Sequence, residues 1–211
     1  MEQTGLFGNA EEAPEIIKLP DGELILHRGF LSKSKADTLF SQWINSIPWQ
    51  QDYITIAGNT LPIPRLQAWF GDNDSYYQYS GIALAPTPWT PALLTLKDII
   101  QSAAGTTFNS LLINLYRNGQ DSVSWHADDE IELGEKPTIA SLSLGETRTF
   151  QLRHVNNRNL NTLSLPLAHG DLVIMKPPLQ EYWLHQIPKS PHTTAPRINL
   201  TFRQIAREST N

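Results

Sequence analysis

The stretch Ala195-Pro196-Arg197-Ile198-Asn199-Leu200-Thr201-Phe202-Arg203 alternates polar and apolar side chains without a break. A period of two residues is typical of a β-strand, because successive side chains point to opposite faces of the sheet. One face of this strand therefore carries Arg197, Asn199, Thr201 and Arg203. That face is either the outer side of an ordinary amphipathic strand or the lining of an anion site, because buried guanidinium groups need an anionic partner.

Working outward from this strand, the chain contains further short alternating or apolar runs bounded by Gly, Pro and Asn, which predict strands. They cover residues 54–59, 110–119, 138–146, 148–154, 162–171 and 171–177. Two stretches predict amphipathic helices: residues 31–47, with Ser32 as N-cap, and residues 91–105, which begin with proline and end with glycine. We expect an α+β protein that is mainly β: a sandwich or jelly-roll barrel with the two helices packed outside it.

The chain has 211 residues, enough to bury a sizeable core, and no repeat or linker divides it. We expect a flexible N-terminal lead over residues 1–14 and a single domain over residues 15–211. The start is acidic and lacks an apolar signal region, and no stretch approaches the ~18 apolar residues of a membrane span. Cysteine is absent, which fits a reducing compartment and leaves His, Asp and Glu as metal ligands. The expectation is a soluble cytoplasmic protein, monomeric by default.

The net charge of −5 argues against a protein that coats nucleic acid, but the charge is unevenly distributed. Between Arg148 and Arg203 there are seven basic and two acidic residues, so this segment carries +5 and the remainder −10. These charges are either scattered and solvated or gathered on one face that meets phosphates.

Six histidines are the main candidates for metal chemistry, and two of them begin an H-x-D motif: His126-Ala127-Asp128 and His169-Gly170-Asp171. On a strand, residues i and i+2 can offer an imidazole and a carboxylate to one ion. We favour the first motif, because Gly170-Asp171 is ordinary turn chemistry before a strand. A distant strand must supply a third ligand, and His185 completes a 2-His-1-carboxylate set of the kind that holds Fe(II). The alternative for His185 is a histidine packed between Trp183 and Pro188.

In this order, the motifs N-x-Y (Asn114, Tyr116), H-x-D, a distal His and R-x-N-x-x-x-R resemble the AlkB family of Fe(II)/2-oxoglutarate-dependent dioxygenases, closest to its DNA-repair subgroup. The resemblance runs from about Pro64 to Ile205 and includes PRLQAWFGD (64–72), YSG (79–81), WHADDE (125–130) and PLAHGDL (166–172). It implies a double-stranded β-helix (jelly-roll) core with flanking N-terminal helices.

The resemblance also implies the roles of individual residues, which fall into three groups. Fe(II) would be bound by His126, Asp128 and His185, and 2-oxoglutarate by Asn114, Tyr116, Arg197, Asn199 and Arg203, with Arg197 on its distal carboxylate. The substrate would be contacted by Asp129 and Glu130 beside the base and by a lid containing Arg65, Trp69, Tyr77, Tyr79 and Ser80.

The implied reaction uses dioxygen and 2-oxoglutarate to demethylate N-alkylated bases such as 1-methyladenine and 3-methylcytosine, releasing formaldehyde, succinate and carbon dioxide. The base must lie in a single strand or be flipped out of a duplex. Duplex-acting relatives carry an aromatic wedge where this chain has small residues, within Ile54–Asn59, so we expect a weaker dependence on, or preference for, duplex DNA than those relatives show. Two alternatives remain: a dioxygenase of the same fold acting on RNA, protein or a small molecule, and a non-catalytic jelly-roll binding module.

Overall fold

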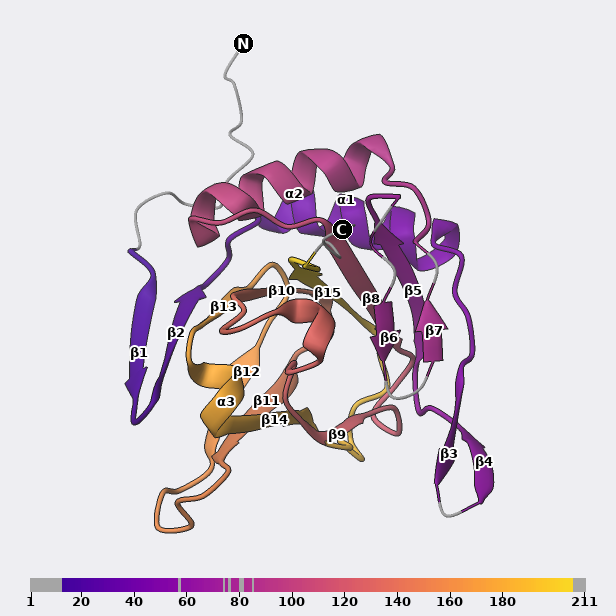
Figure 1. The fold of residues 1–211 in the computed structure, drawn as a ribbon. Coiled ribbons are helices and arrows are strands. Elements are labelled where there is room, and N and C mark those ends of the chain that lie inside the picture. The colour runs from indigo at the N-terminus through magenta and orange to yellow at the C-terminus, as the bar shows by residue number, and fades with distance from the viewer. Residues whose placement is uncertain are drawn as a thin grey trace, which may run out of the picture.

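The fold of this chain, taken from a computed structural model, consists of two β-sheets facing each other and two helices covering the larger sheet (Figure 1). The structure describes residues 13–206, apart from residues 57, 74, 76, 80, 81 and 85. The larger sheet has the strand order β1-β2-β13-β10-β15-β8-β5, and the smaller sheet has the order β12-β11-β14-β9. Two hairpins, β3-β4 and β6-β7, stand apart from them.

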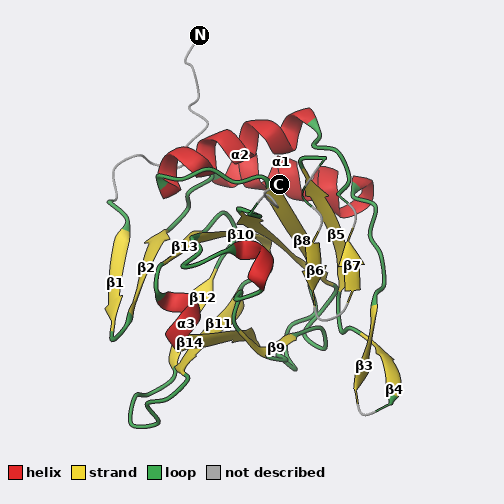
Figure 2. Cartoon of the chain, viewed as in Figure 1, coloured by secondary structure: helices red, strands yellow, loops and turns green. Residues whose placement is uncertain are grey.

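The helices, coloured red in Figure 2, are α1 (Lys33–Ser46), α2 (Pro91–Ala104) and the single turn α3 (Leu179–Tyr182), with a 3-10 turn at Ile131–Leu133. The strands are β1 (Glu15–Leu19), β2 (Gly22–His27), β3 (Tyr53–Ile56), β4 (Asn59–Pro62), β5 (Leu66–Gly71), β6 (Tyr77–Tyr79), β7 (Ile82–Leu84), β8 (Ser110–Tyr116), β9 (Val123–His126), β10 (Ile139–Gly145), β11 (Arg148–His154), β12 (Leu163–Leu167), β13 (Leu172–Lys176), β14 (Trp183–Ile187) and β15 (Arg197–Arg203).

Both predicted helices are confirmed, together with their end signals. Ser32 Oγ accepts a hydrogen bond from the backbone N–H of Lys35 at the start of α1. Pro91 begins α2, and Gly105 ends it in the left-handed conformation with φ 65°, which residues with a Cβ rarely adopt. Local signals were sufficient here because each helix is capped by its own neighbours in the sequence.

The alternation in β15 places its two faces in different environments, and this settles which way the polar face points. Ile198, Leu200 and Phe202 belong to the core between the larger sheet and the two helices. Arg197 and Arg203, on the other face, line a pocket between the two sheets. The polar face is therefore the lining of a site, and the ordinary amphipathic strand is excluded.

A second core fills the remaining space between the sheets, and it includes Leu152 and Trp183 from the smaller sheet and Leu112 and Val173 from the larger one. Four of the seven strands of the larger sheet, β8, β15, β10 and β13, and the four strands of the smaller sheet, β9, β14, β11 and β12, make up the two sides of this sandwich. This is the expected jelly-roll core, and the mainly β architecture is confirmed. No helix within the described residues is long and apolar enough to cross a membrane.

Candidate active site

The histidines His126 and His185 lie directly opposite each other on neighbouring strands at the edge of the smaller sheet. His126 ends β9, His185 is in the middle of β14, and the two are register partners. Their ring centroids are 4.2 Å apart. A ligand atom from each histidine and one from Asp128 all lie within 4.8 Å of one another, which makes this group able to hold a metal ion.

Asp128 lies in the loop after β9 and is 1% exposed. An ion pair with Arg203 holds its carboxylate. Its Oδ1 accepts a hydrogen bond from Arg203 Nη2 at 2.7 Å. Its other oxygen, Oδ2, is buried and has no hydrogen-bond partner among the described residues. Burial alone would raise the pKa of Asp128, but Arg203 and the two imidazoles outweigh burial and lower the pKa to about 2. The carboxylate is therefore ionised at neutral pH, as a metal ligand must be.

Both imidazoles are kept neutral by burial. Burial lowers the pKa of His185 to about 3, and the neighbouring His126 acts in the same direction. The pKa of His126 is also lowered by burial. His126 Nδ1 lies 2.8 Å from the carbonyl oxygen of Ser124, so a proton on Nδ1 leaves Nε2 available as a ligand. The two rings are in the protonation state that metal binding requires.

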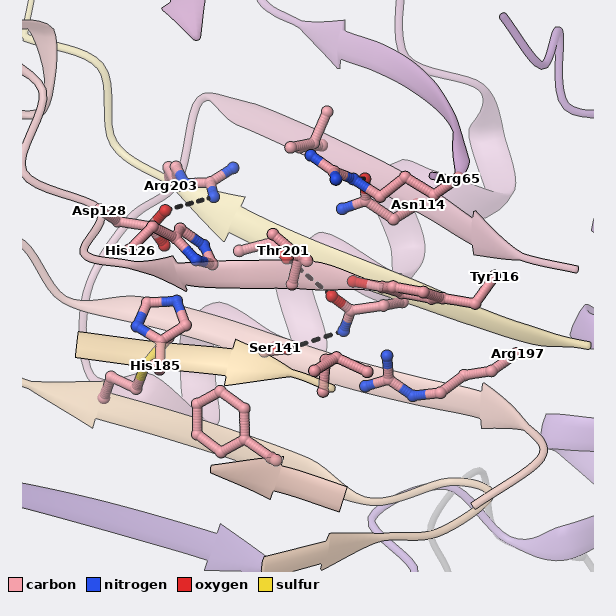
Figure 3. Close-up of a pocket in the computed structure, with 16 residues that line it drawn as sticks. Arg65, Asn114, Tyr116, His126, Asp128, Ser141, His185, Arg197, Thr201 and Arg203 are labelled. Carbon is pink, nitrogen blue, oxygen red and sulfur yellow. Dashed lines mark hydrogen bonds and ion pairs between the residues drawn. The ribbon is translucent and has the colours of Figure 1, made fainter. Parts of the chain in front are cut away.

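Across the pocket, the larger sheet contributes a row of polar side chains (Figure 3). Register pairs Arg197 with Tyr116 and Asn199 with Asn114, so residues from β15 and β8 form matched positions on one face. In Figure 3 the three metal-ligand candidates lie at one end of the pocket, and Tyr116 and Arg197 lie at the other. All eight residues predicted for iron and 2-oxoglutarate line this one pocket: Asn114, Tyr116, His126, Asp128, His185, Arg197, Asn199 and Arg203.

Arg197 is a buried cation without an acidic partner. It is 1% exposed, and its Nη2 donates to Ser143 Oγ at 2.8 Å, while Nε and Nη1 make no hydrogen bond of standard geometry. Burial lowers the pKa of Arg197 to about 10, so the group stays charged at neutral pH. Among the described residues no carboxylate forms an ion pair with it. A buried charge in this state favours an anionic ligand.

The predicted substrate residues are placed less uniformly. Arg65 is buried in the pocket, where its Nε donates to Asn114 Oδ1 at 2.9 Å. Trp69 is buried under the sheet, with Nε1 donating to the carbonyl of Ser75, and does not line the pocket. Asp129 is exposed in the loop after Asp128 and Glu130 is half-buried there. Tyr77 and Tyr79 are described only as backbone of β6, and Ser80 lies outside the described residues.

The second H-x-D motif is structural. Asp171 accepts hydrogen bonds from Arg28 Nη1 and from the backbone N–H groups of Gly29 and Ala168. His169 Nδ1 accepts the N–H of Gly145. These contacts fix a turn before β13, and the preference for His126 and Asp128 agrees with the structure.

Sequence reasoning missed several residues that line the pocket, such as Ser141, or that bond to its lining, such as Ser143. Ser141 Oγ accepts a hydrogen bond from Asn199 Nδ2 at 2.7 Å, and Ser143 Oγ accepts from Arg197. The two serines alternate with leucines in the run 138–146, and this polar alternation was the available signal. The apolar wall of Leu112, Phe150 and Ile187 carries no such signal, because any core strand contains similar residues.

Comparison with known proteins identifies the family. The sequence profile of the 2OG-Fe(II) oxygenase superfamily matches residues 23–203. Human alpha-ketoglutarate-dependent dioxygenase alkB homolog 3 is 43% identical over 201 residues, covering 90% of this chain and 70% of that protein. Mouse DNA oxidative demethylase ALKBH2 is 36% identical over 210 residues, covering 97% and 79%. The solved structure of OsALKBH1 has a TM-score of 0.64 at 19% identity, covering 90% of this chain and 100% of that chain, and supports the fold. The chain therefore belongs to the AlkB family of the 2OG-Fe(II) oxygenase superfamily.

Proposed function

We propose that this protein is a DNA repair dioxygenase that uses Fe(II), 2-oxoglutarate and dioxygen to demethylate N-alkylated bases. The observation that carries the proposal is a single pocket with a His-Asp-His group at one end and, at the other, a buried arginine that forms no ion pair with any described carboxylate. Relatives named as dioxygenases and as DNA oxidative demethylases support the same conclusion.

The residues present fit a metal ion. Asp128 Oδ2 and His185 Nδ1 are buried polar atoms without hydrogen-bond partners in the described part of the chain, an arrangement that is unfavourable unless a ligand completes it. Two neutral imidazoles and one carboxylate on one side leave the remaining coordination positions open, as Fe(II) oxygenases require. We assign His126, Asp128 and His185 as the iron ligands.

The residues at the far end of the pocket fit a dicarboxylic acid. Arg197 offers Nε and Nη1 to an anion, and a guanidinium can bind a carboxylate with two parallel hydrogen bonds. Tyr116 lies against Arg197, with the guanidinium carbon 5.3 Å from the ring centroid. An acid that reaches from the metal to Arg197 therefore has a partner at both ends, and we assign Arg197, Tyr116, Asn114, Asn199 and Arg203 to 2-oxoglutarate.

With Fe(II) and 2-oxoglutarate bound, dioxygen oxidises 2-oxoglutarate to succinate and carbon dioxide and hydroxylates the N-methyl carbon, which then leaves the base as formaldehyde. The side chains of this protein prepare that chemistry. Arg203 holds Asp128 Oδ1, and the Ser124 carbonyl orients His126. Phe150 and Ile187 form part of an apolar wall that limits water around the reacting atoms.

The substrate side of the proposal rests on position. Asp129 and Glu130 directly follow the ligand Asp128, and we assign them, with Arg65, Tyr77, Tyr79 and Ser80, to the base; Trp69 is buried outside the pocket lining and is not assigned to it. The sequence left open whether the basic residues between Arg148 and Arg203 gather on one face, and the burial of Arg148, Arg197 and Arg203 argues against such a face. We propose a monomer in the cytoplasm that binds a base in single-stranded DNA or one flipped out of a duplex.

Succinate release with different substrates tests this function. The purified protein with Fe(II) and 2-oxoglutarate is given one of three substrates of matched concentration: methylated single-stranded DNA, RNA of the same sequence and lesion, or a methylated peptide. We expect DNA to stimulate succinate release most strongly. Equal or greater stimulation by RNA would make RNA the substrate, and stimulation by the peptide alone would overturn the nucleic-acid assignment.

A further inference from the structure

The backbone of Asp128 is anchored by a residue that no motif of the site contains. Gln180 Oε1 accepts the N–H of Asp128 at 2.9 Å, and this contact is buried. Gln180 is 4% exposed, and its Nε2 points to Met175 Sδ at 3.4 Å. Both ends of the Gln180 amide are therefore occupied inside the protein, and its position is defined.

Gln180 lies in α3, and α3 leads directly into β14, the strand that carries His185 (Figure 1). This turn of helix is firmly held. Leu179 is fully buried, and Trp183 Nε1 donates to the carbonyl of Pro20 at 2.8 Å. A Cβ at Gly22 would lie 2.6 Å from Leu179 Cδ1, so the Leu179 side chain packs directly against the backbone of β2. The Gln180 amide is thus presented to Asp128 from a rigid element.

Asp128 needs such an anchor because it is not part of a strand. It follows the end of β9 at His126 and precedes the 3-10 turn at Ile131. Outside the strand no ladder hydrogen bonds fix the backbone. Arg203 holds one carboxylate oxygen, but a single contact at Oδ1 leaves the main chain of Asp128 free to rotate around it. The second contact, at the backbone N–H, removes that freedom and aims Oδ2 toward the histidines.

We propose that Gln180 is a positioning residue of the metal site: its amide ties the Asp128 loop to the segment that carries His185 and so fixes the spacing of these two ligands. The inference rests on the metal site of the proposed function but is independent of the nucleic-acid substrate. Residues that orient metal ligands from outside the coordination sphere typically contribute about 10- to 100-fold to metal affinity.

Titration with Co(II) as an oxygen-stable stand-in for Fe(II), followed by its visible absorption, tests the proposal without any substrate. Gln180→Met keeps the side-chain length but removes the acceptor, and we expect its Co(II) affinity to fall about 10- to 100-fold with an altered absorption spectrum. Gln180→Glu keeps an oxygen in the same place and restores affinity to within about threefold of the wild type.

Gln151→Met is the matched control, since the amide of Gln151, in β11, bonds to Gln186 in β14 and to Ser164 in β12, and Gln151 does not line the pocket. We expect its Co(II) affinity and spectrum to be unchanged. Circular dichroism of each metal-free variant reports folding, and if Gln180→Met does not fold, Gln180→Asn carries the test because its shorter amide cannot reach Asp128 at the same distance. Unchanged Co(II) affinity in the folded variant, or Gln180→Glu as weak as Gln180→Met, would overturn the proposal.

Discussion

Arg203 Nη2 donates a hydrogen bond to Asp128 Oδ1 at 2.7 Å, with the two side chains 3% and 1% exposed. This buried ion pair links β15, the last strand in the sequence, to the loop after β9. It occupies one carboxylate oxygen and leaves the other facing the histidines, so Arg203 contributes to the metal-ligand end of the pocket. Its predicted contact with 2-oxoglutarate stays a prediction.

Removing the cation of this pair should destabilise the protein. In Arg203→Met, the Asp128 carboxylate stays buried without its partner, and we expect the free energy of unfolding of the metal-free protein to fall by about 3–5 kcal/mol. Urea denaturation measures this change. Lys33→Met is the control, because it removes a solvent-exposed ion pair with Asp37, and there the loss should stay below about 0.5 kcal/mol. A loss for Arg203→Met as small as that of the control would contradict this account.

Arg197→Met should affect 2-oxoglutarate binding strongly and the stability of the metal-free protein only weakly. Arg197 has no acidic partner within the described structure, so its removal should destabilise the metal-free protein much less than removal of Arg203. Loss of the carboxylate contact should raise the KM for 2-oxoglutarate on the order of 30-fold or more, from about 2 kcal/mol or more of lost binding. Steady-state succinate formation measures the KM, and an unchanged KM would place the acid elsewhere.

The contrast between the two H-x-D motifs can also be tested directly. Asp171→Asn removes the charge that holds Arg28 and two backbone N–H groups, and we expect a loss of about 2 kcal/mol or more in unfolding free energy. Co(II) affinity should be unchanged in this variant, whereas Asp128→Asn should lose it. Weakened Co(II) binding by folded Asp171→Asn would mean that the second motif takes part in the site.

The hairpin β3-β4 gives a prediction about strand preference. Ile56 pairs with Asn59, and Gly58 in the turn between them is exposed with φ 81°; Ala57 lies outside the described residues. Without an aromatic side chain to fill the gap left by a flipped base, we expect single-stranded DNA to be repaired at least as fast as duplex. Initial rates on one methylated oligonucleotide, alone and annealed to its complement, decide this, and a tenfold preference for duplex would refute it.

Much of this fold was predictable because its signals are local. The helix caps at Ser32 and Gly105 lie beside the segments they end, and the alternation in β15 marks a strand with one polar face. The alternation alone did not predict the direction of that face, because the direction depends on which side of β15 the helices cover; only the family resemblance indicated it. Strand β2 (Gly22–His27) was also missed, since its burial comes from pairing with β13, far along the chain.

The site likewise contains residues that the sequence identifies and contacts that it does not. His126, Asp128 and His185 are recognisable because their residue types and order are characteristic, while the contact of Gln180 with Asp128 spans 52 positions and follows from tertiary packing alone. The basic segment from Arg148 to Arg203 shows that composition alone does not predict which charges lie on the surface. The Arg148 guanidinium donates to the carbonyls of Asn118, Asp121 and Pro188. It therefore holds loops together inside the protein and is not part of a phosphate-binding surface.

The most direct test of the central claim is mass spectrometry of a single-stranded oligonucleotide carrying 1-methyladenine, incubated with the protein, Fe(II), 2-oxoglutarate and air. We predict the loss of one methylene mass, abolished when iron or 2-oxoglutarate is omitted and in the His185→Ala variant. An unchanged oligonucleotide mass, in a preparation that still converts 2-oxoglutarate to succinate, would contradict the assignment of this protein as a DNA demethylase.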